Sequence, residues 1–193
     1  MFLQMRKMTH TVAAVSAVGI LALTAGCTDE QKEPQAGTAT QTEQAKDAGA
    51  PAAVATKEVK VNVYYPRDDG TGLLPVSRTV KLENEDKYTA ALKSLLTGTK
   101  EKGQTNVIPK KAKLRSVTVK DGVATADFSK ELQQNFSGGS TGEEMLIGSI
   151  VNTLTDFPEV KKVQILIDGA SVETLSGHLD LSEPLPRMTE LLK

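Results

Sequence analysis

The sequence predicts an α+β fold for the folded part of the chain, with two helices on one face of a mostly antiparallel or mixed sheet. Segments that alternate apolar and polar residues occur in consecutive pairs, and a segment with helical spacing follows each of the first two pairs. The resulting order, β-β-α-β-β-α-β-β, is typical of an α+β domain. Asp121-Gly122 and Asp168-Gly169 predict tight hairpin turns, because a type I′ turn needs positive φ at both central residues.

The first half of the predicted domain contains two strands and a helix. Residues 59–65 alternate in the manner of a half-buried strand, and a second strand is predicted at 76–82. Asn84 or Asp86 can cap the helix that follows, and Gly98 supplies its stop signal. The apolar stripe of this helix consists of Tyr88, Ala91, Leu92, Leu95 and Leu96.

The remaining strands are predicted around the two Asp-Gly pairs. Strands at 113–119 and 123–128 flank the first pair and form a hairpin. The segment 161–167 is apolar nearly throughout, which indicates a central strand. The second Asp-Gly pair leads into a last strand at 171–175, and residues 177–193 are expected to be irregular.

The second helix is predicted to begin in the glycine-rich segment GGSTGEE. Ser140 with Glu143, or Thr141 with Glu144, fits a capping box. Pro158 ends the helix. Its apolar face consists of Leu146, Ile147, Ile150, Val151 and Leu154.

The N-terminal residues have the pattern of a secretory signal peptide. Arg6 and Lys7 give a basic start, and the uncharged, mostly apolar run at 11–23 is followed by small residues. This run is shorter than the roughly 20 apolar residues that a membrane-spanning helix needs. The pattern therefore predicts export of the chain.

Cys27, the only cysteine of the chain, follows this pattern directly. The segment LTAGC that ends in it resembles a bacterial lipobox, although Thr24 stands where Leu is commoner. The resemblance implies cleavage before Cys27 and attachment of a diacylglyceryl group to its thiol, so that the acylated residue binds membrane lipid. The alternative is a free thiol, which is disfavoured because it would form stray disulfides in an oxidising compartment.

Residues 28–55 are nearly free of large apolar side chains, which predicts a disordered tether. About 28 flexible residues have a root-mean-square span of roughly 30 Å. The tether would therefore keep the folded part close to the membrane.

The composition argues against cofactor, metal and nucleic-acid binding. Without residues 1–26 the net charge is −3, which lacks the basic excess of a nucleic-acid-binding domain. His178 and Cys27 are then the only histidine and cysteine, too few for a zinc or haem site. We expect no cofactor.

Several segments occur in the order and with the spacing of a known family. These segments are VYYP at 63–66, LLPVSRTVKL at 73–82, ALKSLLTG at 91–98, IPKKAKLRSVTVKDGVATADFSKEL at 108–132, GGSTGEE at 138–144 with the helix that follows it, and FPEVKKVQILIDGASVETLSGHLDLSEPLPR at 157–187. In them the chain resembles the GerM domain, the sporulation and spore germination module of bacterial surface proteins. It departs from the family at Thr99, where members often have proline, and in carrying one copy where some relatives carry two.

This resemblance implies a fold similar to the ring-building motifs of secretion-apparatus proteins and a role in assembling or stabilising envelope complexes, with no established catalytic residues. The predicted organisation is a lipoprotein signal peptide at 1–26, a lipidated cysteine and disordered tether at 27–56, a GerM-like domain at 57–187 and a C-terminal tail at 188–193.

A hydrolase is the competing interpretation. Residues 138–142 match the G-x-S-x-G nucleophile elbow, and Asp156 or Asp168 and then His178 follow in the order of an α/β-hydrolase. The elbow requires a buried strand before it, but the preceding segment is polar. We therefore interpret residues 138–142 as a glycine loop before a helix and expect a non-enzymatic protein.

Two functions remain. The first is a membrane-anchored extracytoplasmic interaction module, whose partner is an envelope protein or a second copy of the chain. Binding residues concentrate on loops, so the expected contact residues come from two loop segments. They are Phe136, Gly138, Gly139, Leu179 and Leu181.

The second function is a surface lipoprotein that binds a small solute or a cell-wall polymer. The basic run Lys110, Lys111, Lys113 and Arg115 would attract an anionic lipid or polymer. Lysines that protect a strand edge from pairing are the simpler interpretation of this run.

Overall fold

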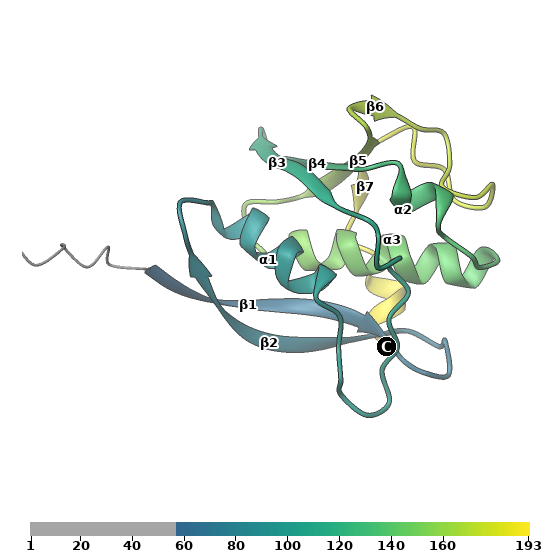
Figure 1. Ribbon diagram of the computed structural model, residues 1–193, viewed down its shortest axis with the longest axis horizontal. Helices are drawn as coiled ribbons and strands as arrows, with labels where there is room; N and C mark the ends of the chain where they lie inside the picture. Colours follow the sequence, from purple (N-terminus) through teal and green to yellow (C-terminus); the bar gives the residue numbers. More distant parts are fainter. Residues whose placement is uncertain (1–56) are drawn as a thin grey trace, which may run out of the picture. The chain divides into compact units, whose positions relative to one another are not determined.

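The computed structural model describes residues 57–193 (Figure 1). The predicted signal peptide, lipidation site and tether lie outside these residues. The described elements are β1 (Lys57–Pro66), β2 (Leu73–Leu82), α1 (Lys87–Leu96), β3 (Leu114–Lys120), β4 (Val123–Phe128), α2 (Glu131–Gln134), α3 (Ser140–Leu154), β5 (Lys162–Ile167), β6 (Ala170–Ser171), β7 (Leu185–Pro186) and the 3-10 helix η1 (Thr189–Leu192).

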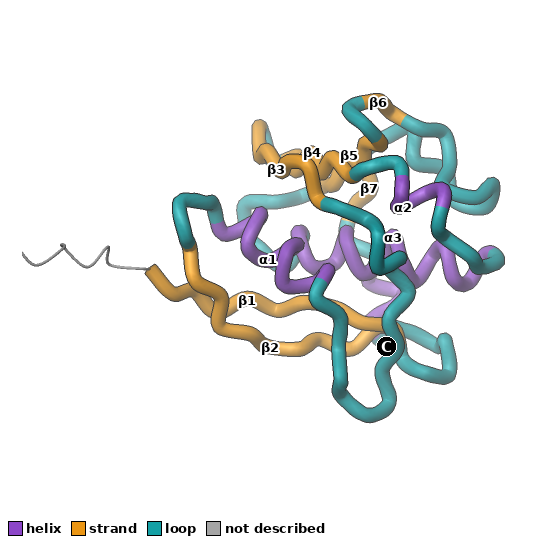
Figure 2. The backbone as a smooth tube through the Cα atoms, viewed as in Figure 1, coloured by secondary structure: helices purple, strands orange, loops and turns teal. Residues whose placement is uncertain are grey.

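The strands form two sheets. β1 and β2 pair antiparallel over ten residues each, and the second sheet has the order β3-β4-β5-β6, with β7 also paired to β5. β4 and β5 are parallel, whereas the other pairs are antiparallel. The α+β fold with a mixed sheet is confirmed. In addition, the β1–β2 hairpin lies on the other side of the helices, so α1 and α3 run between the two sheets (Figures 1 and 2).

The predicted helix cap and the first predicted hairpin turn are both present in the structure. The Asp86 carboxylate accepts hydrogen bonds from the backbone N–H groups of Tyr88 and Thr89, both at 2.9 Å, and so caps α1. Asp121 and Gly122 have φ values of 51° and 80°, which confirms the predicted turn between β3 and β4.

The beginning of α3 differs from the prediction. Gly139 occupies the N-cap position, and no side chain makes a capping hydrogen bond there. The capping-box prediction was wrong because Glu143 turns into the interior, where it is 0% exposed. Its carboxylate accepts hydrogen bonds from the backbone N–H groups of Leu175, Ser176 and His178 at 2.8–3.0 Å, and from the Ser176 hydroxyl at 2.7 Å.

These hydrogen bonds also explain why the last predicted strand is short. Residues 172–178 wrap around the Glu143 carboxylate, so only Ala170 and Ser171 pair with β5. A buried carboxylate must have hydrogen-bond partners, and a loop of successive N–H groups provides them better than a strand does. The C-terminal loop is thereby attached to the first turn of α3.

The last residues of the described chain belong to the domain core. The Asn152 side chain, which is buried, donates to the Met188 carbonyl at 3.0 Å and accepts from the Met188 N–H at 2.9 Å. Met188 and Leu191 are 8% and 5% exposed, and a Cβ built at Gly148 would lie 2.4 Å from Leu191 Cδ1. The segment predicted as a separate tail at 188–193 therefore packs directly against α3.

Replacement of Glu143 should destabilise the domain in a pH-dependent way. Burial raises the pKa of the Glu143 carboxyl, but the hydrogen bonds from Ser176, Leu175 and His178 lower it by more, so the net pKa lies below its usual value. A lowered folded-state pKa favours folding above the unfolded pKa of roughly 4.3, and this contribution is lost as the pH falls through the folded pKa. Glu143→Gln should cost about 1–3 kcal/mol at pH 7 and weaken the acid dependence of stability, measured by urea unfolding from pH 7 to pH 3.

The matched control is Glu144→Gln at the neighbouring, partly exposed glutamate. It should change the free energy of unfolding by less than about 0.5 kcal/mol at pH 7. Equal losses in the two variants would contradict the role assigned to the Glu143 carboxylate.

Truncation of Leu191 should show that η1 is part of the core. Leu191→Ala removes a buried side chain that packs against α3 and should cost about 2–4 kcal/mol. Leu192→Ala, the same change at a partly exposed neighbour, should cost less than about 1 kcal/mol. Urea-unfolding midpoints measure both, and similar values would mean that η1 is not firmly packed.

Candidate interaction groove beside residues 106 to 110

Two adjoining hollows lie along the segment between α1 and β3. The first has a volume of about 100 Å³, and the second, which is more open, has a volume of about 320 Å³. Both are lined by Asn106, Val107, Ile108 and Lys110. We refer to the two hollows together as the 106–110 groove.

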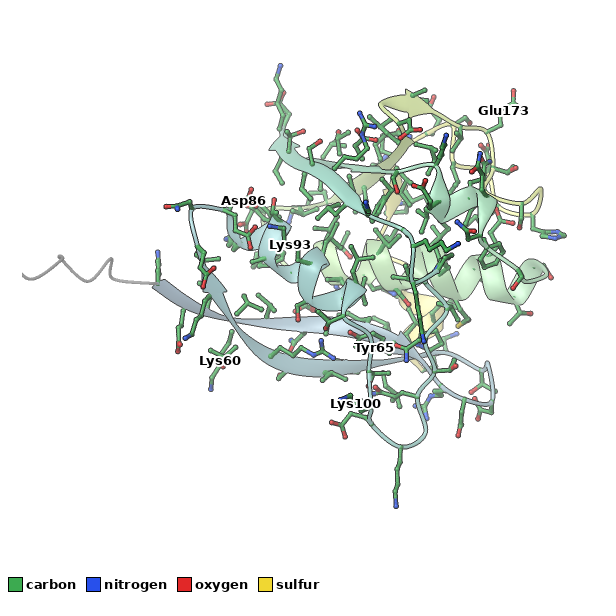
Figure 3. The ribbon with its side chains drawn as sticks, in the orientation of Figure 1. Lys60, Tyr65, Asp86, Lys93, Lys100 and Glu173 are labelled. Atoms are coloured by element: carbon green, nitrogen blue, oxygen red, sulfur yellow. The ribbon has the colours of Figure 1, made fainter. Side chains whose placement is uncertain are left out.

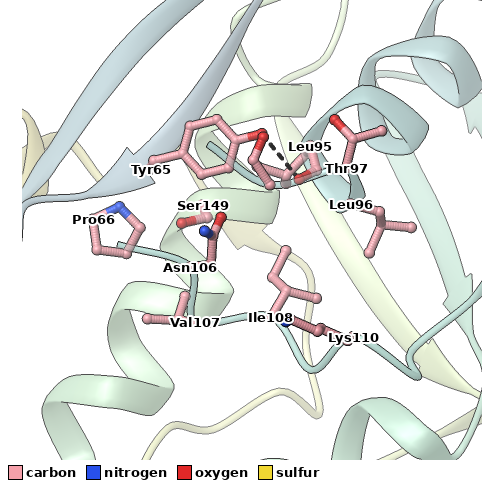
Figure 4. Close-up of a pocket in the computed structure, with 11 residues that line it drawn as sticks. Tyr65, Pro66, Leu95, Leu96, Thr97, Asn106, Val107, Ile108, Lys110 and Ser149 are labelled. Carbon is pink, nitrogen blue, oxygen red and sulfur yellow. Dashed lines mark hydrogen bonds between the residues drawn. The ribbon is translucent and has the colours of Figure 1, made fainter. Parts of the chain in front are cut away.

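The first hollow is mainly apolar and lies at the C-terminal end of α1 (Figure 4). Leu95 and Leu96 of α1, Tyr65 of β1 and Ser149 of α3 line it, together with Val107 and Ile108 from the loop. The Tyr65 hydroxyl donates to the carbonyls of Leu95 and Gly98, each at 3.0 Å. Burial raises the pKa of the Tyr65 phenol, so this hydroxyl stays a donor at neutral pH.

Arg78 on β2 holds the end of α1 in place. Its guanidinium donates to the carbonyls of Ser94 at 2.7 Å and Gly98 at 2.6 Å, and to the Thr97 hydroxyl at 2.8 Å. The guanidinium carbon also lies 5.3 Å from the centre of the Tyr65 ring. Cations favour the C-terminal end of a helix, and here the arginine satisfies carbonyls that would otherwise lack partners.

The loop beside the groove is closed by Asn106. Its side chain accepts from the Thr99 N–H at 2.7 Å and donates to the Thr99 carbonyl at 3.1 Å. Thr99 is buried and its hydroxyl donates to Gln104 at 2.8 Å. Proline, which family members often have at position 99, would lack the N–H that binds Asn106. Threonine at this position therefore allows the hydrogen bond that closes the loop.

Phe136 lies at the second hollow, where glycines support its ring. The lining of this hollow is completed by Pro109, Asn135, Phe136, Ser137 and Gly142. A Cβ at Gly138 would come within 2.7 Å of Phe136 Cζ, and one at Gly142 within 3.4 Å. The two glycines therefore allow the ring to lie against the backbone.

The predicted contact residues have different positions. Phe136 lines the groove and Gly138 lies under its ring, whereas Gly139 is exposed at the start of α3 with open space around it. Leu179 is partly buried and Leu181 is 1% exposed. Leu181 packs in the core and does not present its side chain to a partner. Its N–H donates to the Glu173 carbonyl at 2.8 Å, and its carbonyl accepts from the Gln164 side chain at 2.9 Å.

The basic run separates into two parts. Arg115 donates to Asp127 at 2.9 Å and to Asp168 at 2.8 Å, so it links β3 to β4 and to the turn after β5. Lys110, Lys111 and Lys113 are exposed and have no carboxylate within 4.0 Å among residues 57–193. Lys110 leaves its positive charge at the groove, and Lys111 and Lys113 follow it in the same exposed segment.

The structure does not assemble the residues of the hydrolase interpretation. Ser140 begins α3 after an irregular segment, and Asp156 lies beyond the other end of this helix, about 24 Å away at 1.5 Å per residue. Asp156 accepts from the Tyr64 hydroxyl at 2.6 Å, and Asp168 pairs with Arg115. Among the described residues no three histidine, cysteine, aspartate or glutamate side chains gather in a metal-binding arrangement.

Sequence reasoning missed most of the groove. Tyr65, Ser149 and Asn106 come from separate segments, and in the sequence each resembles an ordinary core or loop residue. One signal was available: the connection between α1 and β3 at 97–113 is long for a compact domain, and long loops are often functional.

The fold and the groove define an α+β domain with its helices between two sheets, and comparisons with known proteins specify it further. The sequence model of the family described as "Germane: Sporulation and spore germination" matches residues 62–173. The spore germination protein GerM of Bacillus subtilis (strain 168) is 30% identical over 139 residues, which cover 68% of this chain and 37% of that protein. The chain thus spans little more than a third of this relative.

Two solved structures also resemble the fold of this chain. The tandem GerMN domains of the sporulation protein GerM from Bacillus subtilis are 28% identical with a TM-score of 0.54, covering 76% of this chain and 50% of that one. The first GerMN domain of the same protein shares the fold, with a TM-score of 0.51, 24% identity, and coverage of 67% of this chain and 98% of that one.

The chain belongs to the Germane family of sporulation and spore germination domains, which confirms the resemblance found in the sequence. Within residues 57–193, none of the helices has the length and apolar character needed to cross a membrane.

Gly138→Ala should displace the Phe136 ring, because the new Cβ would come within 2.7 Å of it. The aromatic NMR signals of Phe136 should shift, and its nuclear Overhauser contacts to Gly142 should weaken. Gly139→Ser is the control, since it adds a side chain in open space at a position where serine is a good N-cap. An unchanged Phe136 spectrum in Gly138→Ala would show that the ring is not held by this contact.

Proposed function

We propose that this chain is a non-catalytic interaction module that assembles or stabilises an envelope protein complex of the sporulation or germination type. Acylated Cys27 holds it at the extracytoplasmic face of the cell membrane. The observation that carries the proposal is the family match over residues 62–173, which includes most of the described domain. The relative that shares 30% identity is named a spore germination protein.

The sequence supports the membrane attachment in this proposal. A basic start, an uncharged apolar run and a lipobox-like LTAGC segment precede a chain with no further cysteine. Two acyl chains give stable membrane binding where one gives only marginal binding, at about 0.8 kcal/mol per buried CH₂ group. The domain would then meet its partners close to the membrane surface.

The second candidate is a lipoprotein that binds a small solute or a cell-wall polymer. The 106–110 groove is the feature that favours it, because Lys110 lines both hollows and two more exposed lysines, Lys111 and Lys113, follow it in the chain. However, sites for small molecules usually measure about 300–1,000 Å³. The apolar first hollow, at about 100 Å³, is smaller and fits an inserted side chain better than a whole ligand, and the second hollow, at about 320 Å³, is more open.

Chemical cross-linking in cells followed by pull-down of the tagged protein tests the two candidates. An assembly module should recover one envelope protein at a constant ratio to itself, in growing or in starved cells. Cys27→Ala should move the protein out of the membrane fraction and lower this recovery at least fivefold, whereas the control Thr28→Ala should leave both unchanged. Recovery of the protein alone, together with retained wall polymer or solute, would contradict the assembly role and favour the second candidate.

A further inference from the structure

We propose that the 106–110 groove binds an extended acidic segment of a partner protein that carries one branched aliphatic side chain. The aliphatic side chain enters the first hollow, and the acidic residues lie along Lys110, Lys111 and Lys113. This inference rests on the proposed function, because it specifies the chemistry by which the module recognises its partner.

The charge around the groove is unbalanced. The connection at 97–113 contains five lysines and one glutamate, although acidic and basic residues are nearly equal in the whole chain. Lys110 lines both hollows, and Lys111 and Lys113 follow it on the exposed side of the same segment. A partner that approaches this surface must be acidic to be complementary to it.

The apolar lining of the first hollow is the reason why the partner segment should carry an aliphatic side chain. Its walls carry the side chains of Leu95, Leu96, Val107 and Ile108, which are apolar. Its polar wall groups are already satisfied: the Ser149 hydroxyl donates to Met145 at 2.7 Å, and the Asn106 amide binds Thr99. Apart from Lys110 at its edge, the polar side chains of this hollow thus have partners within the domain, and an apolar group gains most from entering its aliphatic part.

The backbone segments that form the first hollow are held in place by hydrogen bonds. Tyr65 and Arg78 fix the end of α1, and the Asn106–Thr99 pair fixes the loop. A preorganised site loses little conformational entropy on binding, which favours a short linear segment as the ligand.

The groove lies at the end of the β1–β2 hairpin opposite Lys57. The described chain begins at Lys57, and the groove adjoins Tyr65 and Pro66 at the other end of β1, about 30 Å away at 3.3 Å per residue. Figure 3 shows Lys60 toward the open end of the β1–β2 hairpin and Tyr65 toward the end where β1 turns into β2.

The test uses the full mature chain carrying Cys27→Ser, which removes the acyl group and leaves the described domain unchanged. Fluorescence anisotropy is measured with a labelled peptide, GSDELDESG, at 50 mM salt. Two matched peptides are GSDESDESG, without the aliphatic side chain, and GSKKLKKSG, with the charge reversed. We expect micromolar binding of the first peptide, at least tenfold weaker binding of the second and none of the third.

Variants locate the binding. Lys110→Glu with Lys111→Glu should weaken binding of GSDELDESG at least tenfold. The control, Lys60→Glu with Lys120→Glu, makes the same charge change at exposed lysines outside the groove and should have an effect below twofold. Ser149→Leu, which fills the first hollow, should remove the preference for the leucine peptide over the serine peptide. Raising the salt to 500 mM should weaken binding, because screening shortens the reach of the lysine charges.

Several results would overturn the proposal. Equal binding of the leucine and serine peptides to the wild-type chain would remove the aliphatic requirement, and equal effects of the two double variants would place the binding elsewhere. Lys110-dependent binding to phosphatidylglycerol vesicles without peptide binding would assign the groove to lipid. If the wild-type chain forms dimers and the Lys110→Glu variant does not, the groove binds a second copy of the chain. If the peptide binds only after residues 28–56 are removed, the groove is occupied by that segment of the chain itself, which has more acidic than basic residues.

The inference and the proposed function can fail separately. If the peptide does not bind but cross-linking recovers an envelope protein at a constant ratio, the groove chemistry is wrong and the assembly role stands. If the peptide binds as expected and no envelope protein is recovered, the groove chemistry stands and the assembly role is wrong.

Discussion

The burial of α3 is the constraint on which the rest of this domain depends. All residues from Met145 to Thr155 are buried, and so is Glu143 in the first turn. A helix that is covered on all sides must find partners for its polar side chains inside the protein. Glu143 finds them in the loop at 175–178 and Asn152 in the backbone of Met188, while the Thr153 hydroxyl accepts from the Tyr64 N–H of β1 at 3.1 Å. These few polar groups thus determine where the C-terminal chain and the β1–β2 hairpin lie.

Much of the fold could be predicted from the sequence because its signals are local. The Asp86 cap, the Asp121-Gly122 turn and the alternation along β1 depend on neighbouring residues, and the structure follows them. The errors concern long-range partners. Glu143 has the spacing of a capping box, but its carboxylate binds residues more than 30 positions later, and no local pattern reveals that. The separation of the β1–β2 hairpin from the other sheet likewise depends on how strands meet across α3.

The candidate site could be predicted only in part for the same reason. Phe136 stood out because an aromatic residue beside several glycines in a loop is conspicuous, and it does line the groove. Leu181 belongs to a loop of similar composition, but it is buried in the core and bonded through its backbone to Glu173 and Gln164, which no local pattern reveals. The apolar hollow combines β1, α1, α3 and the 97–113 connection, so its existence follows from tertiary packing. The lysines were visible in the sequence, whereas their freedom from ion pairs, in contrast to Arg115, was not.

The contacts between α3 and residues 187–191 also set the order in which the domain can fold. Arg187 donates to the Tyr64 hydroxyl at 2.7 Å across 123 sequence positions, and Met188 completes the pairing of Asn152. Contacts of such high sequence separation form late and slow the folding of a domain. A nascent chain that has not yet reached residue 188 leaves the apolar surface of α3 incompletely covered and Asn152 without its partners. The domain therefore completes its core only after residues 187–191 have joined α3, and any shortening of the chain before residue 188 should leave it incompletely folded.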